Sequence, residues 1–104
     1  MTDSYTLAIT GLLNEVNDLK GLDLELHPFW SYPILDARNT SFGYKLHRSG
    51  DDRIMSLAVD TCGGFDQSPD GRTILTADAK AHIGKAIEAF WGTANSDRHI
   101  YVKV

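Results

Sequence analysis

At 104 residues the chain can hold one hydrophobic core but not two, and 42% hydrophobic with 23% charged residues excludes a disordered chain. A formal net charge of −4 with no basic stripe argues against direct DNA or RNA binding, which depends on neutralising phosphates. The sequence has no apolar run of membrane-spanning length, no signal-peptide pattern and one cysteine, so we expect a single cytoplasmic domain over residues 1–104 and no membrane partner.

The first element in chain order is an amphipathic helix over residues 4–20. Its apolar residues recur at three- and four-residue steps: Tyr5, Ala8, Ile9, Leu12, Leu13, Val16 and Leu19. Lys20 and Gly21 then supply the cation and the glycine that often end helices. Residues 22–27 alternate strictly, which predicts a strand with its leucines inward and with Asp23 and Glu25 outward on one face.

An aromatic segment follows, in which Phe29, Trp30 and Tyr32 lie between Pro28 and Pro33. Proline lacks a backbone donor and restricts the residue before it, so we expect a loop here rather than a regular strand. Aromatic side chains on a preorganised loop suit a contact surface, because each buries a large area at a small entropic cost. The alternative is a lid over one edge of the core, since tryptophan is highly buried on average.

A β-hairpin over residues 42–60 is the central feature of the chain. Phe42, Tyr44 and Leu46 alternate with other residues, as in a strand that is buried on one face. Residues 54–59 are largely apolar on both faces, which predicts a second strand inside the sheet rather than at its edge. Further on, residues 69–71 (Pro-Asp-Gly) predict a turn that closes a second, looser hairpin.

The chain ends with a second helix and a last strand. The helix carries an apolar stripe at helical spacing, made of Ile83, Ala86, Ile87, Phe90 and Trp91, and Gly92 ends it. Residues 98–104 are rich in β-formers and should close the sheet. The predicted fold class is therefore α+β: a mainly antiparallel sheet of four to six strands, an N-terminal helix, and a second helix before the C-terminal strand. Both helices should pack on one face of the sheet.

No catalytic or metal site is predicted. The four histidines and Cys62 lack the close spacings of metal ligands, and Cys62 has no assignable histidine partner. Residues 66–71 begin like a calcium loop, but Ala77 stands where the loop requires glutamate. We expect neither enzymatic activity nor a cofactor.

The uneven distribution of charge indicates a protein partner. Residues 1–37 hold six acidic residues and one lysine, whereas the rest of the chain is nearly neutral. An acidic face steers association with a basic protein surface, although a solvated helix and edge strand would give the same pattern. We predict a small interaction module that binds, and inhibits or shields, another protein. The predicted contact residues are Phe29, Trp30, Tyr32, Asp18, Asp23 and Glu25.

Small acidic domains without diagnostic motifs commonly serve as immunity proteins, phage-encoded inhibitors of host defence, or secretion chaperones. A helix followed by strands resembles the opening order of type III secretion chaperones, whereas the C-terminal helix and final strand depart from that family. The alternative function is a small-molecule-binding domain or minor enzyme with a pocket near Cys62, Asp60 and His47. A homodimer through an edge strand, residues 22–27 or 98–104, is a further alternative, because exposed edges pair readily.

Overall fold

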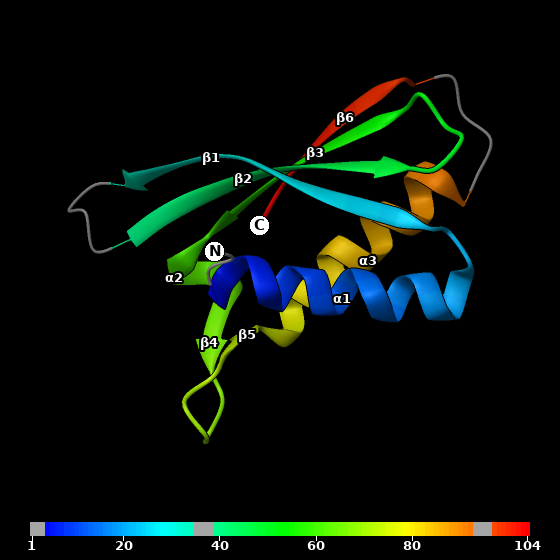
Figure 1. Ribbon diagram of the computed structural model, residues 1–104. Coiled ribbons are helices and arrows are strands. Elements are labelled where there is room, and N and C mark those ends of the chain that lie inside the picture. Colours follow the sequence, from blue (N-terminus) through cyan, green and yellow to red (C-terminus); the bar gives the residue numbers. More distant parts are fainter. Residues whose placement is uncertain (1–3, 35–38, 93–96) are drawn as a thin grey trace.

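The structure is a computed structural model that describes residues 4–34, 39–92 and 97–104, without the side chains of residues 32–34 and 39. The elements in chain order are α1 (Ser4–Lys20), β1 (Leu24–Ile34), β2 (Asn39–Arg48), β3 (Ile54–Asp60), α2 (Thr61–Gly64), β4 (Phe65–Gln67), β5 (Thr73–Leu75), α3 (Ala77–Trp91) and β6 (His99–Lys103) (Figure 1). The predicted fold class is confirmed, including the helix before the C-terminal strand.

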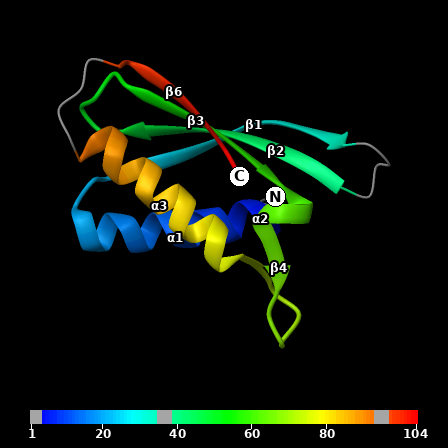
Figure 2. The same ribbon diagram turned by 180° about the vertical axis from the view of Figure 1, so that it is seen from behind.

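The strands form one four-stranded sheet and a separate two-stranded hairpin. The order in the large sheet is β1-β2-β3-β6, so β3 is central, as predicted. β1, β2 and β3 pair antiparallel, whereas β6 runs parallel to β3. The hairpin of β4 and β5 is closed by the predicted turn at residues 69–71. Figures 1 and 2 show α1 and α3 together on one side of the large sheet.

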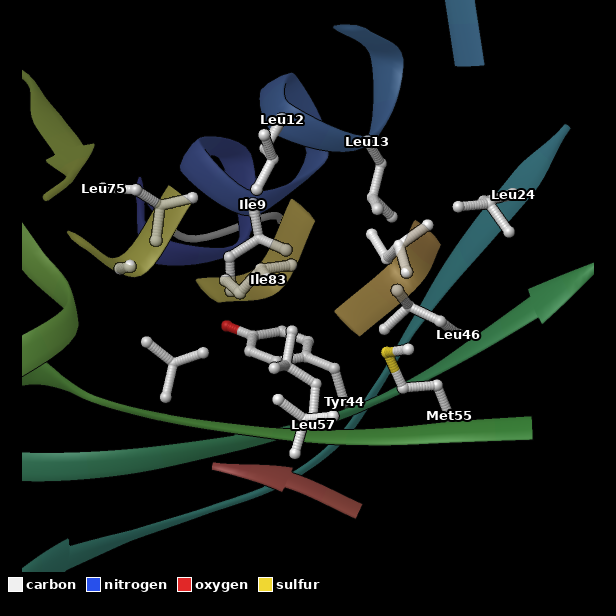
Figure 3. Packing of buried hydrophobic residues seen from close by; sticks show 14 of the residues in the cluster. Ile9, Leu12, Leu13, Leu24, Tyr44, Leu46, Met55, Leu57, Leu75 and Ile83 are labelled. Atoms are coloured by element: carbon white, nitrogen blue, oxygen red, sulfur yellow. The ribbon is translucent and has the colours of Figure 1, made fainter. Parts of the chain in front are cut away.

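The core lies between the large sheet and the two long helices. In Figure 3, Tyr44 of β2 and Leu57 of β3 point toward Ile9 of α1 and Ile83 of α3. The hydroxyl of Tyr44 lies 3.2 Å from Oγ1 of Thr6, so this buried aromatic also has a polar contact with α1. The predicted helical stripe of residues 83–91 is buried here, because it is the face of α3 that meets the sheet.

One residue of the predicted stripe on α1 is exposed. Leu19 is 82% exposed, although it follows the buried Leu12 two turns further along the helix. β5 lies beside the first half of α1, where it helps to cover Leu12, and does not reach the last turn (Figure 1). There the side-chain amide of Asn17 donates a hydrogen bond to the C=O of Leu24 and accepts one from its N–H, which connects the end of α1 to the start of β1.

The prediction of a loop over residues 28–33 is wrong, because β1 continues through both prolines to Ile34. Two features accommodate the prolines. β1 is an edge strand, so a missing N–H can face its unpaired side, and the register shifts between Pro28 and Trp30, which makes a β-bulge at Phe29. The strand also starts later than predicted, since Asp23 has a left-handed φ of 57° and lies before Leu24.

The turn between β2 and β3 is fastened to the end of α3 through Arg53. Asp51 accepts hydrogen bonds from the backbone N–H and the guanidinium of Arg53. The same guanidinium donates to the carbonyl oxygen of Phe90 over 2.8 Å. These hydrogen bonds from Arg53 lower the pKa of Asp51 to about 2.

Stability should therefore depend on Asp51 in acid. Because its pKa is lower in the folded state than in the unfolded chain, its contribution is complete above about pH 4 and is lost as the pH falls toward 2. We expect the urea midpoint of Asp51→Asn to fall less steeply than that of the unmodified protein between about pH 4.5 and 2. Equal slopes for the two proteins would contradict this role of Asp51.

Candidate functional site

The surface of interest is the outer face, defined as the face of the four-stranded sheet opposite α1 and α3. Alternation along each strand places on it Glu25, His27, Phe29 and Trp30 of β1; Gly43, Lys45 and His47 of β2; Ile54, Ser56 and Ala58 of β3; and His99, Tyr101 and Lys103 of β6. Figures 1 and 2 show no helix of the described chain over this face. It is therefore the part of the sheet that is open to a partner.

Strand register arranges these residues in three rows across the sheet. The first row is Trp30, Gly43, Ala58 and Lys103; the second is His27, Lys45, Ser56 and Tyr101; the third is Glu25, His47, Ile54 and His99. Aromatic residues thus lie at both edges of the face, with small and polar residues between them.

Trp30 lies against the backbone of the neighbouring strand at Gly43. A Cβ added to Gly43 would come 2.1 Å from Cε2 of Trp30 and 2.5 Å from Nε1, so the indole occupies the space of a missing side chain. This is a cross-strand aromatic packed on a glycine, and only glycine permits it. Trp30 is half-buried as a result.

Phe29 is the most exposed aromatic of the outer face. The bulge gives β1 one extra residue, and Phe29 is 62% exposed there. The ammonium nitrogen of Lys45 lies 4.3 Å from the centroid of its ring, which is a cation–π contact. A hollow of about 240 Å³ opens beside Phe29 and Trp30, but its wall also includes Thr6 of α1 and the inward-facing Tyr44, so it lies on the helix side of the sheet. The bulge therefore presents an exposed apolar side chain on the outer face.

Histidines fill the polar part of the face. The rings of His27 and His47 meet edge to face at 5.0 Å, and Nε2 of His27 lies 3.4 Å from a carboxylate oxygen of Glu25. Nε2 of His99 lies 2.7 Å from the hydroxyl oxygen of Ser56. Within the described ranges, no three His, Cys, Asp or Glu side chains are grouped so that they could hold a metal ion.

Only some of the predicted contact residues meet on this face. Phe29, Trp30 and Glu25 do, whereas Asp18 is exposed on α1, in the opposite layer. Asp23 is exposed ahead of β1, so the strict alternation that would place it beside Glu25 does not extend to it. The side chain of Tyr32 lies outside the described residues, although its backbone pairs with Ser41.

The predicted contact residues did not include the polar and aromatic residues that complete the face, namely Lys45, His47, His99, Tyr101 and Lys103, and of these only His47 was named at all, for the alternative pocket. Their signal was period-2 alternation, since each lies between residues that point into or toward the core. Alternation alone could not tell whether a helix covers the second face of the sheet.

The residues of the alternative pocket do not converge. His47 pairs with Ile54 at the start of β3, whereas Asp60 ends the same strand and has Lys103 Nζ 3.6 Å from its carboxylate. Cys62 is exposed on α2. A separate groove of about 670 Å³ runs between α1 and β5, and its wall includes the exposed side chains of Leu7 and Ile74. None of the three pocket residues lines that groove.

Comparison with protein-family models, with curated proteins and with solved structures found no match for this chain. None of the helices in the described part of the chain has the length and apolar character needed to cross a membrane.

Proposed function

We propose that this protein is an interaction module whose outer face, centred on Phe29 and Trp30, binds another protein and inhibits or shields it. The observation that carries this proposal is the 62% exposure of Phe29 on a bulged strand beside Trp30. A large aromatic held in water beside a second aromatic and a polar surround has the composition of a binding hot spot.

Preorganisation supports the same proposal. Trp30 is held by its contact with Gly43, and Phe29 is held by the bulge and by Lys45. Side chains that are already fixed lose little conformational entropy on binding, so more of the contact energy appears as affinity. Polar groups around the aromatics, including His27 and Tyr101, would form the rim of the contact.

The partner we propose is a protein with a basic surface. Glu25 lies on the outer face together with Lys45 and Lys103, so the attraction would come from the chain as a whole, which carries a net charge of −4. Asp18 and Asp23 would add to the long-range attraction rather than to the contact itself, so the association rate should fall with salt. The roles that fit are an immunity protein, a phage-encoded inhibitor of host defence or a secretion chaperone, acting in the cytoplasm, where the lone Cys62 stays reduced.

Replacing Phe29 with alanine tests the proposal. Because the ring is mostly in water, we expect the free energy of unfolding to change by no more than about 0.5 kcal/mol. Binding should weaken at least about tenfold, which is a loss of about 1.4 kcal/mol. The measurement is capture of partners by tagged protein from lysates of the source organism and of its host or rivals, followed by titration of the purified partner.

Leu19→Ala is the matched control for that experiment. It also removes an exposed apolar side chain, 82% accessible, but from α1 in the opposite layer. A stoichiometric partner that is retained by Leu19→Ala and lost by Phe29→Ala supports the proposal. The proposal fails if no partner is captured at low salt, or if the captured partner binds Phe29→Ala as tightly as the unmodified protein.

A further inference from the structure

The two edges of the large sheet differ in how well they are protected from pairing with another strand. The β1 edge carries Pro28, Pro33 and the bulge at Phe29, which are devices that prevent strand addition. β6 is a regular strand from His99 to Lys103, without proline or bulge, and no described strand lies beyond it. The chain thus blocks one edge and leaves the other able to pair.

The backbone of β6 shows which groups are free for pairing. The carbonyl oxygen of Arg98 accepts a hydrogen bond from the N–H of Ile54. The N–H of Val104 donates to the carbonyl oxygen of Ala58, and the carbonyl oxygen of Val104 accepts from the N–H of Asp60. In a parallel ladder, alternate residues make these bonds, so the residues that face β3 are the even-numbered ones from Arg98 to Val104. The N–H and C=O groups of His99, Tyr101 and Lys103 consequently point away from the sheet.

The side chains next to this edge favour one kind of occupant. His99, Tyr101 and Lys103 stand on the outer face, and Tyr101 is 60% exposed. An incoming strand would place alternate residues beside them. An acidic residue there complements Lys103, whose side chain is 59% exposed although its ammonium lies 3.6 Å from the carboxylate of Asp60. Its remaining residues would lie beside the half-buried Ile100 and the buried Val102, where apolar side chains fit.

A second copy of this chain fits the edge poorly. Two β6 strands paired antiparallel about Tyr101 would set Lys103 of each copy opposite His99 of the other, and neither β6 strand offers a carboxylate to the other copy. Lysine on an edge strand discourages pairing between identical chains. The same lysine would attract an acidic strand, so the β6 edge favours an acidic strand over a second copy of β6.

We propose that β6 is a docking site for an extended segment of another protein, which adds to the sheet as a fifth strand and carries acidic residues alternating with apolar ones. Backbone hydrogen bonds to the three outward residues would supply the affinity, and the alternating side chains would supply the selectivity. This site lies across the sheet from Phe29 and Trp30, so it goes beyond the function proposed above and can hold if that contact fails.

The test uses the full chain labelled with ¹⁵N and a blocked seven-residue peptide that reads the same from either end: threonine, glutamate, valine, threonine, valine, glutamate, threonine. We expect the peptide to slow hydrogen exchange at the amides of His99, Tyr101 and Lys103 at least about tenfold when it is saturating. The same peptide with lysine in place of glutamate should bind at least about tenfold more weakly. Phe29→Ala should leave peptide binding unchanged.

Two variants at one position separate backbone pairing from side-chain contact. Tyr101→Pro removes an N–H that points away from β3, so it breaks no bond within the sheet, and it should weaken peptide binding at least about tenfold. Tyr101→Thr removes the ring but keeps the N–H, and should bind within about threefold of the unmodified protein. Thermal unfolding tests whether both variants fold. If Tyr101→Pro does not fold, the effect of the peptide on hydrogen exchange at His99, Tyr101 and Lys103 of the unmodified protein tests the proposal instead.

Three results would overturn the proposal. The first is no binding up to about 1 mM peptide. The second is a folded Tyr101→Pro that binds the peptide as well as Tyr101→Thr, or protection that maps to β1 instead of β6. The third is protection of the three β6 amides that rises with protein concentration without peptide, because the edge would then pair with a second copy.

Discussion

Replacing Gly43 with alanine is expected to destabilise the protein by about 1–3 kcal/mol, although alanine normally suits a strand better than glycine. The new Cβ would stand 2.1 Å from Cε2 of Trp30, so the indole or the strand must move. Urea unfolding measures the loss. Gly63→Ala is the control, because a Cβ there meets no atom within 4 Å, and its effect should stay within about 0.5 kcal/mol.

A double-mutant cycle assigns this loss to Trp30. In a Trp30→Ala background the space above Gly43 is empty, so adding the methyl group should become neutral or slightly stabilising. The coupling between the two substitutions should then be about 1–3 kcal/mol. Additive effects would show that Trp30 does not rest on Gly43, and the preorganised aromatic contact would lose its structural basis.

The same pair of residues bears on the two interpretations of the aromatic segment, core lid or contact surface. A tryptophan that is fully buried costs about 3–5 kcal/mol when it is truncated to alanine, and one wholly in water costs little. Trp30 lies between these limits, because one side of its indole rests on Gly43 while the residue remains half-buried. Phe29 is the cleaner probe of binding, since its ring is mostly exposed.

Local patterns predicted the elements wherever burial follows a single period. The stripe from Ile83 to Trp91 and the alternation of Tyr44 and Leu46 each identify an element and its buried face. The aromatic segment was predicted as a loop, not a strand, because the rule that excludes proline from strands depends on the partners of the strand. Among the described strands, β1 has a neighbour on one side only, and the sequence near Pro28 does not contain that information.

The candidate site depended on long-range placement in the same way. Phe29, Trp30 and Glu25 were identified by residue type and by their position in a distinctive segment. Joining them to Tyr101 and Lys103 requires the register of four strands and a parallel β6, which no local pattern encodes. Placing the acidic residues required the same long-range information, since Asp18 and Glu25, which are close in sequence, lie in opposite layers.

Two leucines of α1 give the sharpest test of which helix face is buried. Leu13 is 2% exposed within the core cluster, and Leu19 is 82% exposed in the last turn of the same helix (Figure 3 shows Leu13). Leu13→Ala should cost about 2–5 kcal/mol, from lost burial and the cavity left behind. Leu19→Ala should change stability by no more than about 0.5 kcal/mol.

Because the same substitution is made twice in one helix, the difference in helix propensity between leucine and alanine contributes nearly equally to both variants. The difference between their free energies of unfolding, measured in urea, therefore reports burial alone. A loss at Leu19 as large as that at Leu13 would mean that the last turn of α1 packs against something in solution. The stripe predicted from periodicity would then be right at Leu19, and that turn would itself become a candidate contact surface.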